Sequence, residues 1–207
     1  LKKEAPEHPF MVGDCRDVVY NIKDRSELFP VELMDMGMWW WYPFPMTKGA
    51  KSDALQGEEA TTGLELVPPT FLTQTKTTKP IWCGIQAYRK PERKDGRFPT
   101  PTEYRAQAYL AVIHGAKGLM YYVGSGSGGN GILNKPEEGN WEYLKSLATE
   151  LRSMAPVFMS PDDKEAVTVA PADALLSVRL KNADGRRILL AASRSDQPIK
   201  AAMKIAS

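Results

Sequence analysis

A strand, a helix and a second strand follow one another between residues 79 and 123, and this order constrains the fold more than any other feature. Residues 81–88 (IWCGIQAY) form an apolar run that predicts a buried strand, and residues 117–123 (KGLMYYV) form another. Between them, the pattern of residues 100–114 predicts a helix. A unit of this kind predicts parallel strands with a helix packed against the sheet.

The start of this helix is marked in the sequence. Thr100 is followed by Pro101 and by Glu103, which is a capping-box pattern with proline at the first helical position. We therefore expect the Glu103 side chain to accept a hydrogen bond from the backbone N–H of Thr100. The helix is apolar on most sides, as a helix packed on a sheet would be, and it ends near the His-Gly pair at residues 114–115.

Two strands are predicted before this unit and one helix after it. Residues 10–15 (FMVGDC) and 32–42 (ELMDMGMWWWY) are apolar runs, and the second stops at Pro43, which cannot donate to a sheet ladder. Residues 140–155 carry apolar side chains at helical spacing. The first 156 residues are therefore predicted to form an α/β domain with a parallel sheet.

Two architectures fit this order of elements, a doubly wound sheet and a (β/α)8 barrel. The loops after the strands are long and carry aromatic residues, as loops at the C-terminal face of a barrel do, and this favours the barrel. The glycines of residues 124–131 (GSGSGGNG) follow a strand but do not lead into a helix. They therefore do not predict a dinucleotide or phosphate site.

The pattern changes after residue 156. Apolar and polar residues alternate at the spacing of a strand, and a turn signal at residues 182–185 (NADG) predicts a β-hairpin. Residues 157–207 are thus predicted to form a small antiparallel β-domain, truncated and similar to a β-sandwich. The predicted strands are residues 166–169, 176–180, 188–192 and 201–205.

The composition argues against several classes of protein. The 207 residues are 43% hydrophobic and 25% charged, and the formal net charge is +2 with both signs interspersed. Neither nucleic acid nor a membrane surface is therefore an expected partner. No apolar run approaches the roughly 20 residues of a membrane span. The two cysteines and two histidines lack metal-ligand spacing, so no metal and no other cofactor is expected.

Four segments resemble a known family. Residues 79–88 (KPIWCGIQAY) and 96–122 (GRFPTPTEYRAQAYLAVIHGAKGLMYY) resemble the last two strands of beta-galactosidase-like glycoside hydrolases of the clan-A type and their uncharacterised relatives. Residues 8–14 (HPFMVGD) and 34–45 (MDMGMWWWYPFP) are similar to strands five and six of the same barrels. The tail after residue 156 is similar to the β-sandwich appended to many of them.

The resemblance implies that residues 1–156 are the C-terminal half of a (β/α)8 barrel, strands five to eight. A half barrel leaves two open strand edges, which aggregate or recruit another chain. We therefore expect the N-terminal half of the barrel, or another chain, to complete the fold. Polysaccharide-acting barrels are often exported, so a secreted or periplasmic location is expected over a cytoplasmic one.

The resemblance also implies where catalytic groups would lie. Most glycosidases use two carboxylates, and in these barrels the acid/base follows strand four, which this chain lacks, while the nucleophile ends strand seven. At that position the sequence has Gln86, a neutral amide that cannot act as nucleophile or base. Asp14, at the end of a predicted strand, and Glu103 are the remaining catalytic candidates. A turn-capping role for Asp14 and the helix cap for Glu103 are the alternatives.

The aromatic run at residues 39–42 (WWWY) is the most unusual feature. Trp and Tyr bury apolar area while keeping a polar group, which suits the C–H faces of sugar rings. Neighbouring strand residues point to opposite faces, so Trp40 lies opposite Trp39 and Trp41, and only part of the run can line a site. Core packing is the alternative for each. The expected substrate-binding residues are Trp40, Trp41, Tyr42, Trp82, Gln86, Tyr88 and Tyr122.

Three functions are compatible with these features. The first is a glycoside hydrolase acting on glycosidic bonds of oligo- or polysaccharides, with carbohydrate as its substrate. The second is a noncatalytic carbohydrate-binding barrel, a degenerate relative that keeps the aromatic residues, and Gln86 favours this alternative. The third is a structural module that binds no sugar. Fold resemblance alone does not decide among them.

Overall fold

The structure is a computed structural model of the chain. The structure describes eight stretches of the chain, and of Asp14, Trp39, Trp41 and Asn134 it describes only the backbone. The described residues are 6–14, 34–41, 79–89, 97–122, 124, 131–134, 139–195 and 197–206.

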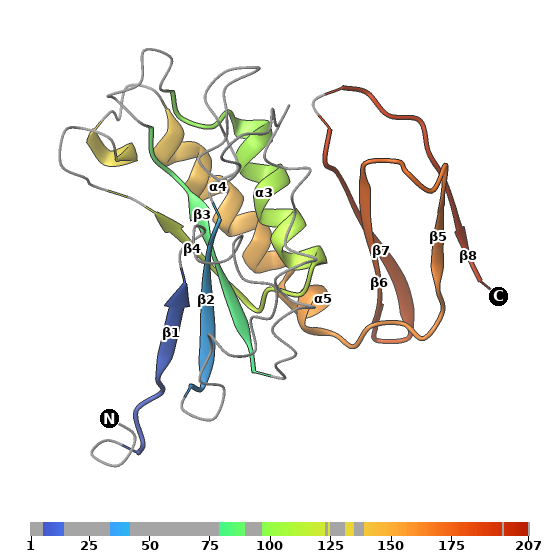
Figure 1. Cartoon of the computed structure of the whole chain (residues 1–207), viewed down its shortest axis with the longest axis horizontal. Coiled ribbons are helices and arrows are strands. Elements are labelled where there is room, and N and C mark those ends of the chain that lie inside the picture. Colours follow the sequence, from blue (N-terminus) through green and yellow to red (C-terminus); the bar gives the residue numbers. More distant parts are fainter. Residues whose placement is uncertain are drawn as a thin grey trace.

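A four-stranded parallel sheet forms the first half of the described fold (Figure 1). The strands lie side by side in the order of the sequence, and each pairs in parallel with the next. Alternating strands and helices thus form a parallel sheet, as the apolar runs predict. The strands are β1 (Met11–Asp14), β2 (Met36–Trp41), β3 (Ile81–Gln86) and β4 (Gly118–Tyr122).

Each face of the sheet receives alternate residues, as the pleat of a strand requires. On β3, Ile81, Cys83 and Ile85 are buried in one cluster with Leu110 of the first helix, so they mark the face that the helix covers. The residues between them therefore point to the opposite face, which we call the aromatic face because of the side chains described below. Cys83 is a buried free thiol, and burial raises its pKa well above the usual range.

Among the described residues, two helices cover the face of the sheet opposite the aromatic face, and a short third helix follows them. Helix α3 (Pro101–Ile113) begins at the predicted capping box and connects β3 to β4, and helix α4 (Asn140–Ser153) comes after β4. A one-turn 3-10 helix, η2 (Ile132–Asn134), precedes α4, and α5 (Ala155–Met159) directly follows it. Helix α5 was not expected from the sequence, and it extends across the boundary predicted at residue 156.

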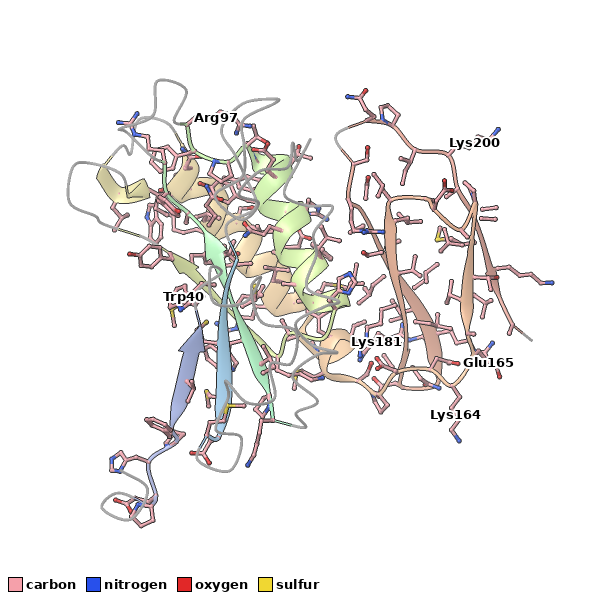
Figure 2. The ribbon with its side chains drawn as sticks, in the orientation of Figure 1. Trp40, Arg97, Lys164, Glu165, Lys181 and Lys200 are labelled. Carbon is pink, nitrogen blue, oxygen red and sulfur yellow. The ribbon has the colours of Figure 1, made fainter. Side chains whose placement is uncertain are left out.

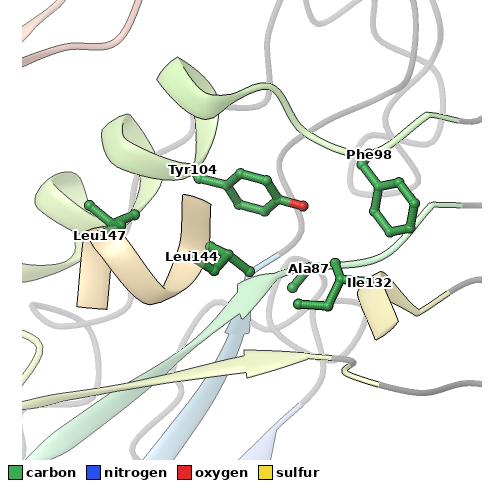
Figure 3. Packing of buried hydrophobic residues seen from close by; sticks show 7 residues of the cluster. Ala87, Phe98, Tyr104, Ile132, Leu144 and Leu147 are labelled. Atoms are coloured by element: carbon green, nitrogen blue, oxygen red, sulfur yellow. The ribbon is translucent and has the colours of Figure 1, made fainter. Parts of the chain in front are cut away.

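A second cluster of buried side chains joins both helices to the carboxyl end of the sheet (Figure 3). Tyr104 of α3 and Leu144 and Leu147 of α4 pack together with Ala87, which follows β3, and with Ile132 of η2. The Tyr104 ring also stacks on Tyr143, with ring centroids 6.2 Å apart. This packing fixes the start of α3 and α4 at the end of the sheet where barrel-type folds place their functional loops.

The last 50 residues form antiparallel pairs of strands, as predicted. The hairpin turns at Asp184 and Gly185, whose φ angles of 51° and 75° are left-handed, the conformation that a two-residue hairpin turn requires. The first and last strands of this part pair with each other and form a sheet separate from that of the hairpin, which lies between them in the sequence. The strands are β5 (Val167–Ala170), β6 (Leu176–Ala183), β7 (Arg186–Ser193) and β8 (Ala202–Ile205).

Helix α3 lies between the parallel sheet and the β6–β7 hairpin (Figure 1). Arg179 of β6 donates to the carbonyl oxygen of Ile113 at 2.8 Å, and the His114 ring lies 2.8 Å from the Ser177 hydroxyl. Ala192 of β7 packs against the core cluster beneath the sheet. The parallel sheet covers one side of helix α3 and the β6–β7 hairpin covers the other. This explains why the helix is apolar on most sides.

The described part of the chain is therefore mixed α/β, with one parallel and two antiparallel sheets. The strands are shorter than the apolar runs suggested, and Asp35, inside the predicted second strand, lies before β2 instead. Its carboxylate accepts a hydrogen bond of 2.7 Å from the backbone N–H of Phe10, which ties the approach to β1 to that of β2. Within the described residues, none of the helices has the length and apolarity needed to cross a membrane.

Candidate functional site

Trp40 lies flat across three strands on the aromatic face. A β-carbon built on Gly84 of β3 would lie 2.4 Å from Cε3 of Trp40, and one built on Gly13 of β1 would lie 3.2 Å from its Nε1. The indole therefore spans from β1 to β3 across its own strand, with one ring face against Gly84. The residue is partly exposed. Trp40 is labelled in Figure 2.

Two tyrosine rings stand beside this indole. Tyr122 of β4 meets Trp40 edge to face, with ring centroids 5.4 Å apart and planes at 73°. Tyr88, just after β3, meets Tyr122 in the same manner at 5.9 Å and 82°. Such edge-to-face pairs are favourable because the positive ring edge meets the negative ring face. Together Trp40, Tyr122 and Tyr88 form what we call the aromatic platform, a floor with an upright wall.

A second tryptophan repeats the arrangement one step nearer the start of the strands. A β-carbon built on Gly118 of β4 would lie 2.5 Å from Cδ2 and Cε2 of Trp82, so this indole lies flat over the neighbouring strand. Trp82 is two residues before Gly84 and therefore shares its face. Glycines at these strand positions create the space that both indoles occupy.

Gln86 completes the same face at the carboxyl end of β3. Its Cα is paired with that of Tyr122, and the residue is 1% exposed. The backbone N–H of Gln86 donates to Oε1 of Gln107, a fully buried residue of α3, at 3.3 Å. Helix α3 thus holds the end of β3 in place where the sheet ladder stops. Gln86 thus lies beside Tyr122, which in turn contacts Tyr88.

Glu103 is engaged in holding the start of α3. Its Oε2 accepts from the Thr100 backbone N–H at 2.6 Å and from Arg97 at 2.7 Å, and its Oε1 accepts from Arg97 at 2.8 Å. Burial raises the pKa of the Glu103 carboxyl, but the hydrogen bonds and charge of Arg97 and the bonds to Thr100 outweigh it, so the pKa lies below its usual value. The capping box is present as predicted, and every Glu103 oxygen has a structural partner.

The other predicted site residues are only partly within the described structure. Asp14 ends β1, with its Cα paired to that of Trp39, but its side chain lies outside the described part. The same holds for the side chain of Trp41 at the end of β2, and Tyr42 lies outside the described residues altogether. Tyr121 packs among the helices, in contact with both core clusters, so of the tyrosine pair only Tyr122 reaches the platform.

The described strand residues of the aromatic face include no carboxylate and no cation. Its side chains are aromatic, methionine or amide, with glycines between them. The described part of the chain also contains no group of three or more His, Cys, Asp or Glu side chains that could hold a metal ion. The aromatic side chains of this arrangement can therefore stack on an apolar ring face.

The role of the glycines was missed by the sequence reasoning. Gly13, Gly84 and Gly118 lie inside strands, where glycine normally weakens a sheet, and such glycines often mark a close approach of another group. That signal was present in the sequence. The sequence did not show which side chain each glycine faces, because this depends on the register between neighbouring strands.

Comparison of the chain with protein-family models, with curated proteins and with solved structures finds no match.

Proposed function

We propose that this chain is part of a glycoside hydrolase-like protein whose aromatic face binds the sugar rings of an oligo- or polysaccharide. The single observation that supports this best is the Trp40 indole, held flat between Gly13 and Gly84 with Tyr122 upright beside it. Sugar rings stack their C–H faces on such surfaces, and a pre-positioned indole binds them without a loss of side-chain freedom.

We further propose that the parallel sheet is the C-terminal half of a (β/α)8 barrel, strands five to eight. Two features support this architecture. The four strands are adjacent in the order of the sequence, whereas a doubly wound sheet reverses its order at a switch point. Both described helices that follow strands lie on one face of the sheet. In this architecture the aromatic face is the barrel lumen, and residues 157–207 are the start of an appended β-domain.

Noncatalytic sugar binding is the second candidate, and Gln86 favours it. The resemblance places the glycosidase nucleophile at this position, where the chain has an amide that is 1% exposed. Glu103 is committed to the start of α3. Asp14, the other candidate, is in register with Trp39 and Cys83 and so alternates with Gly13 of the aromatic face. Hydrolysis by the usual route requires two carboxylates about 5 to 10 Å apart. In this second function the platform holds sugar without cleaving it.

Binding of oligosaccharides to Trp40→Ala tests the proposed site. We expect the wild-type chain to bind a neutral oligosaccharide in isothermal titration calorimetry, and the Trp40→Ala chain to lose about tenfold or more in affinity, the equivalent of roughly 1.4 kcal/mol of stacking. Trp40→Phe keeps an aromatic ring and should retain part of the affinity. Trp141→Ala is the matched control, because this indole is 39% exposed on α4 and contacts Lys145.

Equal loss of affinity in Trp40→Ala and Trp141→Ala would contradict the platform, as would no binding by the wild-type chain to any of a broad panel of neutral oligosaccharides. Release of reducing sugar from the same panel then separates the two functions. Release by a longer polypeptide that includes this chain supports a hydrolase, and binding without release supports the noncatalytic alternative.

A further inference from the structure

The β6–β7 hairpin meets helix α3 through polar side chains on one strand and apolar side chains on the other. Ser177, Arg179 and Lys181 alternate along β6, so they share the face that points toward α3 and toward the residues before β5. Their paired residues on β7 lie on the same face and are apolar: Ala192, Leu190 and Ile188. The contact therefore depends on hydrogen bonds and charges as well as on apolar burial.

Hydrogen bonds join β6 to the C-terminal end of α3. The His114 ring, at the C-cap position, lies 2.8 Å from the hydroxyl of Ser177, a residue that is 5% exposed. Arg179 donates to the carbonyl oxygen of Ile113 at 2.8 Å. This carbonyl is one of those that a helix end leaves without an intrahelical partner. Both bonds exist only while the hairpin lies against the helix.

The charges that face His114 from the hairpin are positive. Arg179 of β6 and Arg194, which follows β7, both disfavour a proton on the ring. The carboxylate of Asp162 accepts from Arg179 at 2.6 Å and from Lys181 at 2.9 Å, so this anion is already bound to two cations. A proton on His114 therefore places a further positive charge beside two guanidinium groups.

Among the described residues, the elements packed on the other side of α3 supply no carboxylate to the His114 ring. Strands β3 and β4 contain no charged residue, and Cys83 and Tyr121, their titratable side chains next to the helix, belong to the core clusters. Carboxylates elsewhere around these elements are paired with cations: Asp163 with Arg187, Glu142 with Lys145 and Glu150 with Arg105.

This setting accepts a neutral imidazole and disfavours an imidazolium. Burial, and then the charges of Arg194 and Arg179, lower the pKa of His114 to about 4. Once the hairpin leaves the helix, the ring meets water and its pKa returns toward the ordinary value near 6.5. The released form therefore binds protons more tightly than the closed form. As the pH falls from about 6.5 toward 4, protonation shifts the equilibrium toward release.

We propose that protonation of His114 releases the β6–β7 hairpin from helix α3, while the helix stays on the parallel sheet. Contacts that do not involve the polar face of β6 hold α3 to the sheet, through Leu110 and Ala111 in one core cluster and Tyr104 in the other. Between pH 7 and pH 5 we expect the ratio of released to closed chain to rise roughly tenfold, allowing for the partial exposure of the ring. This inference does not rest on sugar binding.

Thiol labelling with dithiodipyridine, which reacts below neutral pH, tests the release. Ala192→Cys places a thiol on the hairpin face that packs against the core cluster, and Ala191→Cys places one on the exposed outer face of the same strand. Both chains carry Cys15→Ser, and the buried Cys83 reports on the parallel sheet. The labelling rate of Ala192→Cys, divided by that of Ala191→Cys at the same pH, should rise about tenfold from pH 7 to pH 5, with Cys83 unlabelled.

Two histidine variants show whether His114 causes the rise. His114→Gln can still hydrogen-bond to Ser177 but does not titrate, so the ratio of rates should change less than twofold. His8→Gln is the matched control, because His8 is the other histidine of the chain and lies before β1, and it should behave as the parent chain does. An equal rise in His114→Gln, no rise in the parent chain, or labelling of Cys83 in step with the introduced thiol would overturn the proposal.

Nuclear magnetic resonance of the unsubstituted chain gives a second measurement, which does not depend on the introduced thiols. The amide signals of Ser177 and Arg179 should change with the same midpoint as the His114 ring, and those of Leu144 and Leu147 in α4 should not. Equal changes in β6 and α4 would show that the whole chain unfolds, and would overturn a release confined to the hairpin.

Discussion

At the scale of single residues, the aromatic face depends on glycines, whose lack of a side chain leaves space for the indole rings. An alanine methyl at Gly84 would lie within 2.4 Å of the Trp40 ring, far inside van der Waals contact. The indole cannot move aside easily, since its Nε1 end is already close to Gly13 and its edge meets Tyr122. Glycine inside a strand costs stability, and here it creates the space in which Trp40 lies flat.

The Gly84→Ala variant should therefore displace Trp40. We expect the free energy of unfolding to fall by about 1 to 3 kcal/mol, the usual range for added volume in a packed region. Urea unfolding monitored by tryptophan fluorescence measures it, and oligosaccharide affinity should fall in the same variant. Gly124→Ala is the control, because its methyl would meet only Leu133 at an ordinary 3.5 Å. Equal stability of the two variants would contradict the close packing of Trp40 on Gly84.

At the scale of elements, helix α3 organises the described fold. Its N-terminus is fixed by the capping box and by the two-point ion pair between Arg97 and Glu103. Its body supplies Gln107 to the end of β3, and its C-terminal residues contact the β6–β7 hairpin. A second set of polar contacts joins it to α4, where Arg105 and Tyr109 both hydrogen-bond to Glu150.

Substitutions at the cap distinguish a structural from a catalytic Glu103. Thr100→Ala removes the side chain that accepts from the Glu103 N–H, and we expect a loss of roughly 1 kcal/mol in thermal or urea unfolding. Glu103→Gln keeps a side chain that can accept at the cap but weakens the pair with Arg97, so it should cost less than about 1 kcal/mol. Sugar binding or cleavage should be unchanged in both variants.

Loss of all sugar cleavage in Glu103→Gln, with the protein still fully folded by circular dichroism, would show that the helix cap is not the whole role of this carboxylate.

At the scale of the whole molecule, a polar contact joins the α/β part to the β-strands that follow it. His114, the C-terminal cap residue of α3, bonds with Ser177, and Arg179 reaches from β6 to the end of α3 while it pairs with Asp162. Lys181, labelled in Figure 2 beside α5, donates to the same carboxylate. Arg179 and Lys181 hold the pKa of Asp162 far below its usual value, although partial burial opposes them.

This contact should make stability depend on pH through His114. Burial, and then the charges of Arg194 and Arg179, lower the pKa of His114 to about 4. Between that value and the unfolded value near 6.5, the unfolded chain binds more protons than the folded one. The contribution of neutral His114 to the free energy of unfolding is therefore fully present above about pH 6.5 and is lost as the pH falls toward 4.

Thermal unfolding between pH 7 and pH 4.5 measures this effect. We expect the wild-type midpoint to fall by a few degrees more than that of His114→Gln, corresponding to about 1 to 2 kcal/mol once the partial exposure of the ring is allowed for. Glutamine can still hydrogen-bond to Ser177 but does not titrate. Parallel midpoint curves for the two proteins would contradict a buried neutral His114.

The sequence by itself determined the local elements whose signals are local. Thr100, Pro101 and Glu103 fixed the start of α3 because a cap involves only residues four or fewer apart. The left-handed turn at Asp184 and Gly185 fixed the hairpin for the same reason. Strand periodicity also predicted that Trp40 lies opposite its neighbours in the sequence, since alternation is a property of the strand alone.

Tertiary structure alone decided which of these elements meet. The indole of Trp40 reaches Gly13 and Gly84 because three strands pair in one particular register, and nothing within β2 specifies that register. The pairing of β5 with β8 and the packing of β7 on α3 join segments more than 30 residues apart, where the balance of burial over the whole chain selects the partner. Local sequence therefore formed the elements, and long-range burial assembled the aromatic face from them.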